Sequence, residues 1–323
     1  MRLKDLGERR IISRIRQSFS GKRPGVILGI GDDAAVVRGP RTLLMTQDLL
    51  VEDVDFRRAL HPPRLLGRKS LNVNLSDLAA MGGRPLHAVL GLALPGNIGV
   101  TWLDEFLSGF REAARAARVA LVGGDISAAA RIMIAVTVTG ETSLFVTRYG
   151  AGPGDRIFVS GTLGDSAAGR RLLERGAKPG KSRPAGHLLQ AFLDPSPRLE
   201  LGFLLAQRKL ASAMIDISDG LTVDLWHICE ESGVGAEVEL ERIPLSKELR
   251  RASRRPLALA LNGGEDFELL FTVPPDNVSR LRHLGSRFKV MDIGRITAGK
   301  KIMAVDSTGK AKPLKIGGYE HFK

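Results

Sequence analysis

Residues 70–83 read Ser-Leu-Asn-Val-Asn-Leu-Ser-Asp-Leu-Ala-Ala-Met-Gly-Gly, and the rest of the chain is best understood outward from them. Their leucines recur at helical spacing, which predicts a helix that ends at the two closing glycines. These leucines are Leu71, Leu75 and Leu78. At about 100° per residue, Ser70, Asn74 and Asp77 fall on one narrow polar stripe of this otherwise apolar helix.

The polar stripe has two interpretations. A solvated helix face would carry Lys and Glu, yet neither stands between Lys69 and Arg84. The stripe is therefore either a set of polar groups hydrogen-bonded inside the fold or part of a functional site. Other acidic residues of the chain favour the second interpretation, because they recur in a similar context.

Composition is typical of a soluble globular protein. The 323 residues suffice for two domains, and 43% of them are hydrophobic and 26% charged. The single cysteine, Cys229, excludes a disulfide framework and a cysteine-based zinc site, and it fits a reducing compartment. Because there is no secretion signal and no apolar run near the ~18 residues of a membrane span, we expect a cytoplasmic protein without a membrane partner.

The formal net charge of +13 has two interpretations as well. A basic chain can bind nucleic acid, but here Lys and Arg are dispersed and only 5% of the residues are aromatic. A generally basic surface that attracts phosphorylated metabolites is favoured, with no specific nucleic-acid partner. Nucleic-acid binding stays open as an alternative, which a salt-titrated binding assay would separate.

Strands and helices alternate in both halves of the chain, which predicts two α/β (α+β layered) domains. A Gly-rich junction at 150–155 divides them into residues 1–150 and 151–323. Expected strands cover residues 26–30 (a buried strand), 42–46, 87–94, 120–122, 132–139, 156–160 and 267–273, and a strand from residue 213 runs into a helix after Gly220. Other expected helices are a basic amphipathic one at 5–20 and those at 102–118, 164–175, 185–193 and 197–208.

Five acidic sites share one pattern, a strand or helix that ends on Gly and Asp. They are Asp32-Asp33, Asp48, Asp77, Asp125 and Asp216/Asp219. Each alone fits a turn or a helix N-cap, but five at element ends favour a site. Two carboxylates ~4 Å apart repel by about 4 kcal/mol at a surface-like dielectric, so a cluster requires cations. Oxygen ligands favour Mg²⁺, which leaves coordination positions for phosphates and suits phosphoryl transfer.

A nucleotide would be held here without the usual phosphate loop, because no G-x-x-x-x-G-K-[S/T] motif is present. Metals would hold it instead, with backbone amides at Gly123-Gly124 and a cation such as Arg148. No residue has the features of an activated nucleophile, since Cys229 is expected on an apolar helix face. We therefore expect direct in-line transfer, with both substrates bound at once and no covalent intermediate.

Five motifs occur together in a fixed order. They are Gly31-Asp32-Asp33-Ala34-Ala35, Asn74-Leu75-Ser76-Asp77-Leu78-Ala79-Ala80-Met81-Gly82, Gly123-Gly124-Asp125, Ile215-Asp216-Ile217-Ser218-Asp219-Gly220 and Gly263-Gly264-Glu265-Asp266-Phe267-Glu268-Leu269-Leu270. This ordered set resembles the thiamine-monophosphate kinases, which make thiamine diphosphate with ATP. The resemblance covers nearly the whole chain and implies the two-domain architecture of the aminoimidazole ribonucleotide synthetase superfamily, with mixed sheets covered by helices.

The resemblance also implies the roles of individual residues. Ligands for several Mg²⁺ ions would be Asp33, Thr46, Gln47, Asp48, Asp77, Asp125, Asp216 and Asp219. ATP would be contacted by Gly124, Asp125, Arg148 and Ser218. Thiamine phosphate would be met by Asp55, Glu265 and Tyr319. Two positions depart from the family pattern, since Gln47 stands where Thr is common and Asp55 where His is common.

Two further implications of the resemblance concern assembly and reaction class. In this superfamily the first domains pair through their strands, which implies a homodimer. Another ATP-dependent synthetase of the superfamily is the alternative activity. A selenophosphate enzyme would be expected to have a reactive Cys or its equivalent near the N-terminus, and this chain has only Cys229.

Overall fold

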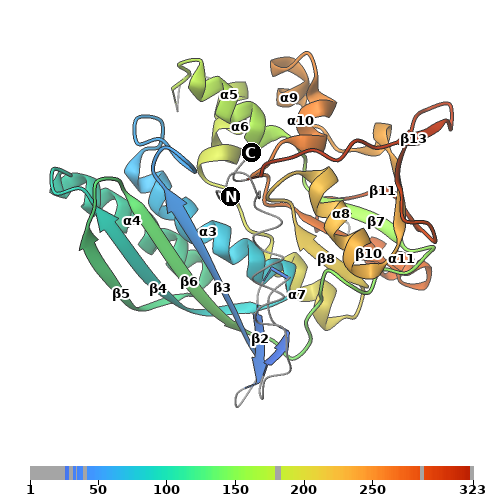
Figure 1. Cartoon of the computed structure of the whole chain (residues 1–323), viewed down its shortest axis with the longest axis horizontal. Helices are drawn as coiled ribbons and strands as arrows, with labels where there is room; N and C mark the ends of the chain where they lie inside the picture. Colours follow the sequence, from blue (N-terminus) through green and yellow to red (C-terminus); the bar gives the residue numbers. More distant parts are fainter. Residues whose placement is uncertain are drawn as a thin grey trace, which may run out of the picture.

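The computed structural model describes residues 26–28, 32–33, 35–38, 42–178, 183–283 and 287–320. Within them the chain is a mixed α/β fold with two sheets covered by helices, as the alternation predicted (Figure 1). The amphipathic helix predicted at 5–20 lies outside the described residues. No helix in the described ranges is both long and apolar enough to cross a membrane.

The first sheet has the strand order β1-β2-β3-β6-β4-β5. Its strands are β1 (Val26–Leu28), β2 (Ala35–Arg38), β3 (Thr42–Val51), β4 (Arg84–Leu94), β5 (Ala120–Ala128) and β6 (Met133–Glu141). The neighbours pair antiparallel except for the parallel pair β4/β5. Helices α3 (Pro63–Ala80) and α4 (Val100–Ala117) cover one face, and their leucines and phenylalanines form one core with the inward strand residues. Within the part of the chain that the structure describes, no helix lies on the other face (Figure 1).

Helices α3 and α4 cross at a distance that only glycine permits. A Cβ atom at Gly67 would lie 2.0 Å from the Phe106 carbonyl oxygen, and one at Gly109 would lie 1.8 Å from that of Arg64. Backbone therefore meets backbone where the two helices cross, and this contact fixes the position of α3 over the sheet.

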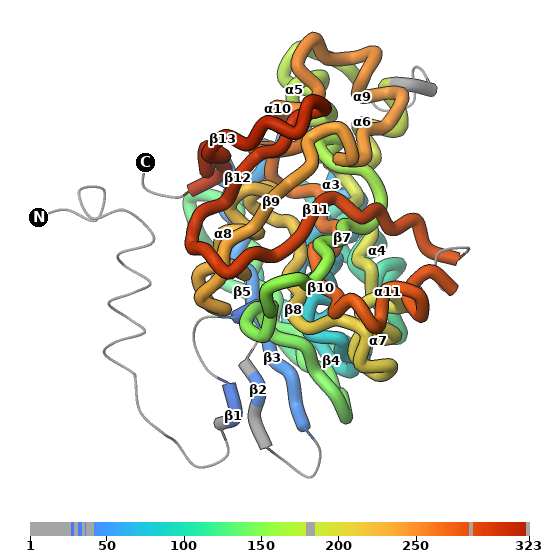
Figure 2. Tube along the Cα trace, turned by 90° about the vertical axis from the view of Figure 1, so that its right-hand side faces the viewer, coloured from blue at the N-terminus to red at the C-terminus, as the bar shows by residue number. Residues whose placement is uncertain are grey.

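The second sheet has the order β13-β12-β9-β11-β7-β10-β8. Its strands are β7 (Arg156–Ser160), β8 (Ala213–Asp216), β9 (Gly235–Glu239), β10 (Leu269–Val273), β11 (Val290–Thr297), β12 (Ile302–Val305) and β13 (Ala311–Pro313). Around it lie α5 (Asp165–Glu174), α6 (Arg183–Leu193), α7 (Leu199–Gln207), α8 (Leu221–Ser232), η1 (Leu240–Arg242), α9 (Lys247–Ala252), α10 (Pro256–Asn262) and α11 (Pro275–Arg282). Helix α8 packs on one face, and α7 and α11 pack on the other (Figure 2).

Helix α3 belongs to both layers. Its leucines lie in the core of the first sheet, whereas Ala79 and Ala80 at its end lie in the core between the second sheet and α7. A Cβ at Gly202 of α7 would lie 2.0 Å from the Ala79 carbonyl oxygen, so these helices also touch through backbone. The division into residues 1–150 and 151–323 stays a prediction. Helix α3 belongs to the first of these segments but packs in the cores of both sheets.

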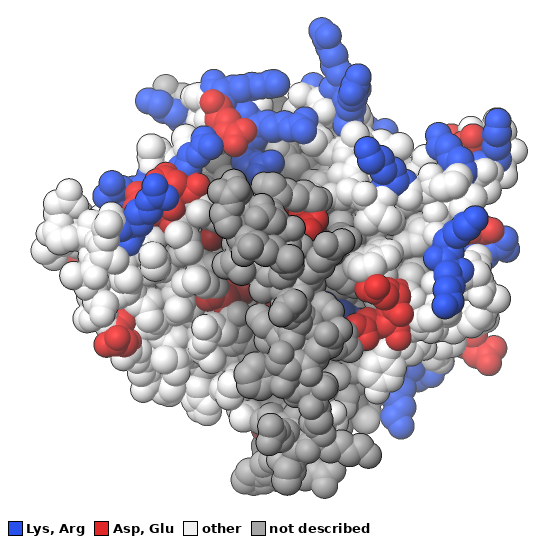
Figure 3. All heavy atoms as spheres, in the orientation of Figure 1, with Lys and Arg blue, Asp and Glu red and all other residues white. Residues whose placement is uncertain are grey.

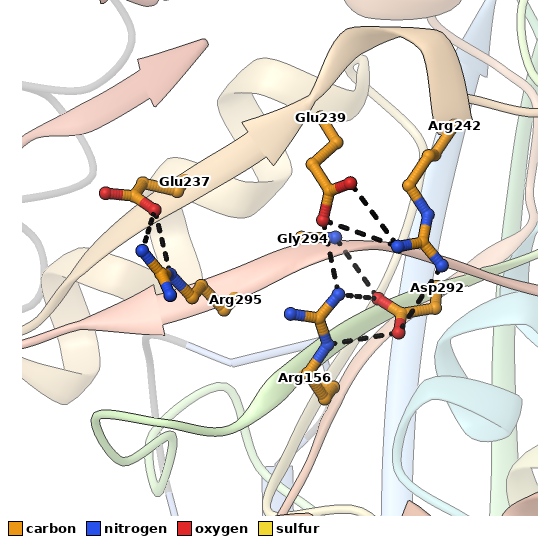
Figure 4. A network of polar contacts seen from close by, with 7 residues as sticks. All are labelled: Arg156, Glu237, Glu239, Arg242, Asp292, Gly294 and Arg295. Atoms are coloured by element: carbon orange, nitrogen blue, oxygen red, sulfur yellow. Dashed lines mark hydrogen bonds and ion pairs between the residues drawn. The ribbon is translucent and has the colours of Figure 1, made fainter. Parts of the chain in front are cut away.

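A network of ion pairs joins three neighbouring strands of the second sheet, β9, β11 and β7 (Figure 4). Arg156 contacts Asp292 at 2.7 Å and Glu239 at 3.3 Å, and Arg242 reaches the same two carboxylates. These side chains are partly exposed, so each pair contributes only about 0–1 kcal/mol to stability. The network therefore links side chains of β9, β11, β7 and η1.

Several predicted element boundaries are wrong, and three of them bear on the site. Strand β3 continues to Val51 instead of ending on Gln47-Asp48, because its partner β6 pairs with it from Leu43 to Val51. Strand β5 continues through Gly123-Gly124-Asp125 to Ala128, because it pairs in parallel with β4. Strand β10 begins at Leu269 rather than Phe267, since Phe267 has a φ of +50° that a strand does not accept.

The first strand is also not buried as predicted. It lies at the edge of its sheet, where Ile27 is 44% exposed.

Candidate active site

Three carboxylates from distant parts of the chain meet between the two sheets. Asp33 follows the first strand, Asp77 lies in the last turn of α3, and Asp216 is the last residue of β8. One carboxylate oxygen from each lies within 4.8 Å of the other two. Three of the eight predicted metal ligands therefore form one cluster, which we call the carboxylate cluster.

Two hydroxyl groups orient the carboxylate cluster. Thr46 of β3 donates to Asp77 Oδ2 at 2.5 Å, and Ser76 of α3 donates to Asp216 Oδ2 at 2.6 Å. Both hydroxyls are buried, so each is held by its carboxylate partner. Sequence reasoning identified Thr46 only from the family resemblance and missed Ser76.

The polar stripe of α3 divides between structural and functional roles. Asp77 enters the carboxylate cluster, but Ser70 donates within its own helix to the Gly67 carbonyl at 3.0 Å. Asn74 accepts a hydrogen bond from the backbone N–H of Asp48 at 3.1 Å, which fixes β3 against α3. Internal hydrogen bonding therefore holds for Ser70 and Asn74, whereas Asp77 lies in the carboxylate cluster and its functional role stays a prediction.

Burial and mutual repulsion perturb the acidic groups strongly. Burial first, and then neighbouring carboxylates, raise the pKa of Asp77 and of Asp216 well above its ordinary range. The pKa of Asp48 rises to about 6 because of burial and the charges of Asp33 and Asp55. The pKa of Asp32 also rises to about 6, from burial and the adjacent Asp33. Shifts of this kind, caused by burial and neighbouring carboxylates, are typical of functional sites.

Arg148 brings one positive charge to this site. Its guanidinium lies 2.5 Å from Asp33 Oδ1, and its backbone N–H donates to Asp32 Oδ2 at 3.0 Å. Burial alone would lower the pKa of Arg148, but Asp33, followed by Asp32 and Asp216, raises it above its ordinary value. One guanidinium does not balance the carboxylate cluster together with Asp32 and Asp48. The donors are all oxygens, so the residues fit a hard divalent cation such as Mg²⁺.

The loop after β8 lies against two segments of the second half. The Ser218 carbonyl accepts the N–H of Glu265 at 2.7 Å, and the Asp219 carbonyl accepts the N–H of Tyr319 at 3.1 Å. Asp224, which sequence reasoning missed, is buried in the first turn of α8 and accepts the N–H of Gly220 at 3.0 Å. Predicted ATP and metal residues therefore stand beside predicted acceptor residues.

The C-terminal segment is anchored rather than frayed. The Thr222 hydroxyl donates to the Gly317 carbonyl at 2.6 Å and lies 3.1 Å from the N–H of Gly317. Gly318 is closely packed, since a Cβ there would lie 2.6 Å from the Asp219 carbonyl oxygen. Tyr319 is thus held over the loop and remains 43% exposed.

Asp55 lies near the first-sheet side of the site. Its Oδ2 accepts the N–H of Val51 at 2.8 Å, and its charge contributes to the raised pKa of Asp48. The turn that follows β3 therefore positions Asp55 close to Asp48.

The structure does not bring Gln47 and Asp125 into the carboxylate cluster. Successive strand residues alternate faces, so Gln47 points away from the side of Thr46 and Asp48, and its Oε1 accepts the Thr137 hydroxyl at 2.7 Å. Asp125 lies on β5, where it pairs with Gly91 of β4, and its side chain is exposed. Gly124 occupies the same edge strand.

Comparison with known proteins places these features in a family. Family models described as "AIR synthase related protein", N-terminal and C-terminal domains, match residues 31–142 and 152–306. The thiamine-monophosphate kinase of Aquifex aeolicus is 38% identical, with all of both chains covered. That of Escherichia coli K12 is also 38% identical, with 98% of both covered.

Solved structures agree with these sequence matches. The structure described as "AaThiL complexed with AMPPCP and TMP" has a TM-score of 0.89 at 37% identity, with 99% of both chains covered. The thiamine-monophosphate kinase of Stenotrophomonas maltophilia has a TM-score of 0.79 at 36% identity, with 94% of this chain and 96% of that one covered. The superfamily architecture predicted from the motifs is confirmed, and the chain belongs to the thiamine-monophosphate kinase family.

Proposed function

We propose that this chain phosphorylates thiamine phosphate to thiamine diphosphate with ATP in a Mg²⁺-dependent reaction. The observation that carries the proposal is the carboxylate cluster of Asp33, Asp77 and Asp216, in a chain that superposes on a relative described with AMPPCP and TMP. A coupled assay that offers ATP, Mg²⁺ and several phosphorylated acceptors tests it. Turnover of thiamine phosphate above all others is expected, and preference for another acceptor would instead favour a different synthetase of the superfamily.

The carboxylate cluster would hold the metal, with Thr46 and Asp48 beside it and Asp219 on the adjoining loop. Bound Mg²⁺ supplies neutralisation of the charge on the phosphate oxygens. The structure supports this assignment, because the buried carboxylates of Asp77 and Asp216 lie close enough to other carboxylates to raise their pKa values. Full turnover in excess chelator would contradict it. Because Gln47 and Asp125 lie elsewhere, we leave their side chains out of this set.

Arg148 and Ser218 are proposed as ATP contacts. Arg148 is buried against Asp33, so its guanidinium already points into the carboxylate cluster, where phosphate oxygens would arrive. Ser218 lies on the loop that follows β8, two residues after Asp216. Gly124 keeps the role implied by the resemblance as a prediction, since its strand is at the sheet edge.

The acceptor would bind beyond this loop. Glu265 offers a carboxylate to a cationic, amine-bearing heterocycle, and Tyr319 offers a ring face to a thiazolium. Their backbone contacts with Ser218 and Asp219 support a position next to the phosphate site. Asp55 is proposed to approach the acceptor from the side of the first sheet.

Phosphoryl transfer is proposed to be direct. Cys229 is buried on α8, where burial raises the pKa of its thiol to about 12, so it is a poor nucleophile. The acceptor phosphate has an oxygen that can attack by itself, and the residues here position the reactants and exclude water. Intersecting initial-rate plots are expected. A trapped phosphoenzyme labelled from γ-labelled ATP, with parallel plots, would overturn this route.

A homodimer through the first sheet is proposed. The face opposite α3 and α4 exposes four large apolar side chains, each 40 to 55% accessible: Met45, Leu49, Val89 and Met133. A face this apolar supports burial against a second copy, which would also cover Gln47 and Asp125. Sedimentation showing a monomer at micromolar concentration would contradict it.

The cytoplasmic location and the lack of a specific nucleic-acid partner remain proposals as well. Lys and Arg occupy several separate parts of the face in Figure 3, with acidic side chains between them, and do not form one continuous stripe there. Salt-sensitive binding of a mixed duplex at physiological salt would contradict the second proposal.

A further inference from the structure

Lys69 is a lysine in the interior of the protein. It lies on α3, two turns before Asp77, and is only 1% exposed. Lysine is almost never fully buried unless its ammonium group is paired, because desolvating the charge is costly. The partners of Lys69 therefore explain why it is there.

Three groups from the second half of the chain surround the ammonium group. Lys69 Nζ lies 2.7 Å from Glu265 Oε1 and donates to the Phe192 carbonyl at 3.1 Å. It also lies 4.2 Å from the centre of the Phe192 ring, which is within the range of a cation–π contact. The ammonium is thus fixed in place by a carboxylate, a carbonyl and a ring.

Glu265 is held tightly by its backbone and only partly by its side chain. Its φ of +66° is left-handed, and its N–H donates to Ser218 beside the carboxylate cluster. Its side chain is 32% exposed, whereas that of Lys69 is 2% exposed. The Lys69 side chain is therefore enclosed in the protein, whereas the Glu265 carboxylate remains partly accessible to a ligand.

Attachment of α3 to the second half does not depend on Lys69. The neighbouring Arg68 forms an ion pair with Asp194 at 2.9 Å, and Asn72 donates to the same carboxylate at 3.2 Å. Burial, and then the charge of Lys69, lower the pKa of nearby His61 to about 4, so His61 is neutral at neutral pH. Lys69 is therefore the residue of α3 whose ammonium group contacts the Glu265 carboxylate.

We propose that Lys69 is a positioning residue for the acceptor. It binds one oxygen of Glu265, so that the rest of the carboxylate faces the amine-bearing, cationic heterocycle of the acceptor at a fixed distance from the phosphate site. This role rests on the proposed function, in which Glu265 contacts thiamine phosphate. Lys69 itself touches neither substrate.

The test is a double-mutant cycle of Lys69→Met and Glu265→Gln, read as separate KM values for thiamine phosphate and ATP. Lys69→Met should raise the KM for thiamine phosphate by about tenfold and that for ATP by less than about twofold, since a charge-assisted contact loses its orientation. In the Glu265→Gln background, the same substitution should change neither KM by more than about twofold. Arg68→Met is the matched control, because it removes the adjacent contact without touching Glu265.

Each outcome decides the inference. Equal effects on both KM values, or full additivity of the two substitutions, would overturn it. If Lys69→Met does not fold, Lys69→Arg is the test variant, because it keeps a cation but changes its position. Lys69→Arg should raise the KM for thiamine phosphate by at least about threefold. That rise should vanish in the Glu265→Gln background. No such rise would overturn the inference. Failure of the parent to phosphorylate thiamine phosphate would instead overturn the proposed function, so the two failures are distinguishable.

Discussion

Asp77→Asn should inactivate the protein and, without metal, stabilise it. The substitution keeps the shape of the side chain and removes one charge from the carboxylate cluster. Two partners, Asp33 and Asp216, have oxygens within 4.8 Å of an Asp77 oxygen. At that distance two full charges repel by about 3.5 kcal/mol at an effective dielectric of about 20.

The net gain is smaller than the two repulsions together. Because the pKa of Asp77 is raised well above its ordinary value, the metal-free protein already relieves part of the repulsion by binding a proton. The hydrogen bond from Thr46 also weakens when its acceptor becomes a neutral amide. We expect a gain of about 1–3 kcal/mol, which corresponds to a few degrees in Tm for domains of this size.

Thermal unfolding with excess chelator and with Mg²⁺ measures both effects. The parent should gain Tm on adding Mg²⁺, and Asp77→Asn should gain little, because it has lost a ligand. Asp194→Asn is the matched control: its carboxylate is paired with Arg68 outside the carboxylate cluster, so this variant should lose Tm in both conditions. If Asp77→Asn melts well below the parent in chelator and keeps its specific activity, Asp77 is structural and the reasoning fails.

Three further predictions test the acidic site and the acceptor side. The folded pKa values of Asp32 and Asp48, about 6, exceed the ordinary 3.8, so the stability they contribute is present below about pH 4 and lost as pH rises through 6. Chelated protein should therefore have a lower Tm at pH 7.5 than at pH 5, and the gain on adding Mg²⁺ should be larger at pH 7.5; a pH-independent gain contradicts this. Tyr319→Ala should raise the KM for thiamine phosphate far more than that for ATP, and equal effects would make the tail structural. Thr222→Val should reproduce part of that acceptor effect by releasing Gly317, whereas unchanged steady-state kinetics would show that the anchor is dispensable.

The helix at the centre of the fold could be predicted from sequence because its signals are local. Leucine spacing and the two glycines are properties of residues 70–83 alone, and α3 ends at Ala80 as they require. The convergence of Asp33, Asp77 and Asp216 followed from a chemical argument, since element ends collect functional groups. The ends of strands were harder to predict from the sequence, because the length of β3 depends on its pairing with β6, which lies far along the chain.

The same limit explains the residues that were missed. Ser76 and Lys69 were visible as members of one helix, but the role of each depends on which residue its side chain contacts. Lys69 meets a carboxylate 196 positions away, and Ser76 meets one 140 positions away. Asp125 failed to join the carboxylate cluster for a related reason: the motif containing it continues as a strand, and the pairing with β4 turns its side chain to the outer face.

These contacts give α3 a proposed role beyond packing. Ser76 reaches Asp216 and Lys69 reaches Glu265, so the same helix contacts the metal end and the acceptor end of the proposed site. At 1.5 Å per residue, Lys69 and Asp77 are separated by about 12 Å along a rigid helix axis. Asp216 pairs with Leu269 on the neighbouring strand β10, so the second sheet sets the spacing between Asp216 and Glu265, and α3 contacts both carboxylates. Under the proposed function, an acceptor whose cationic ring and phosphate are much closer together is expected to reach only one of the two ends.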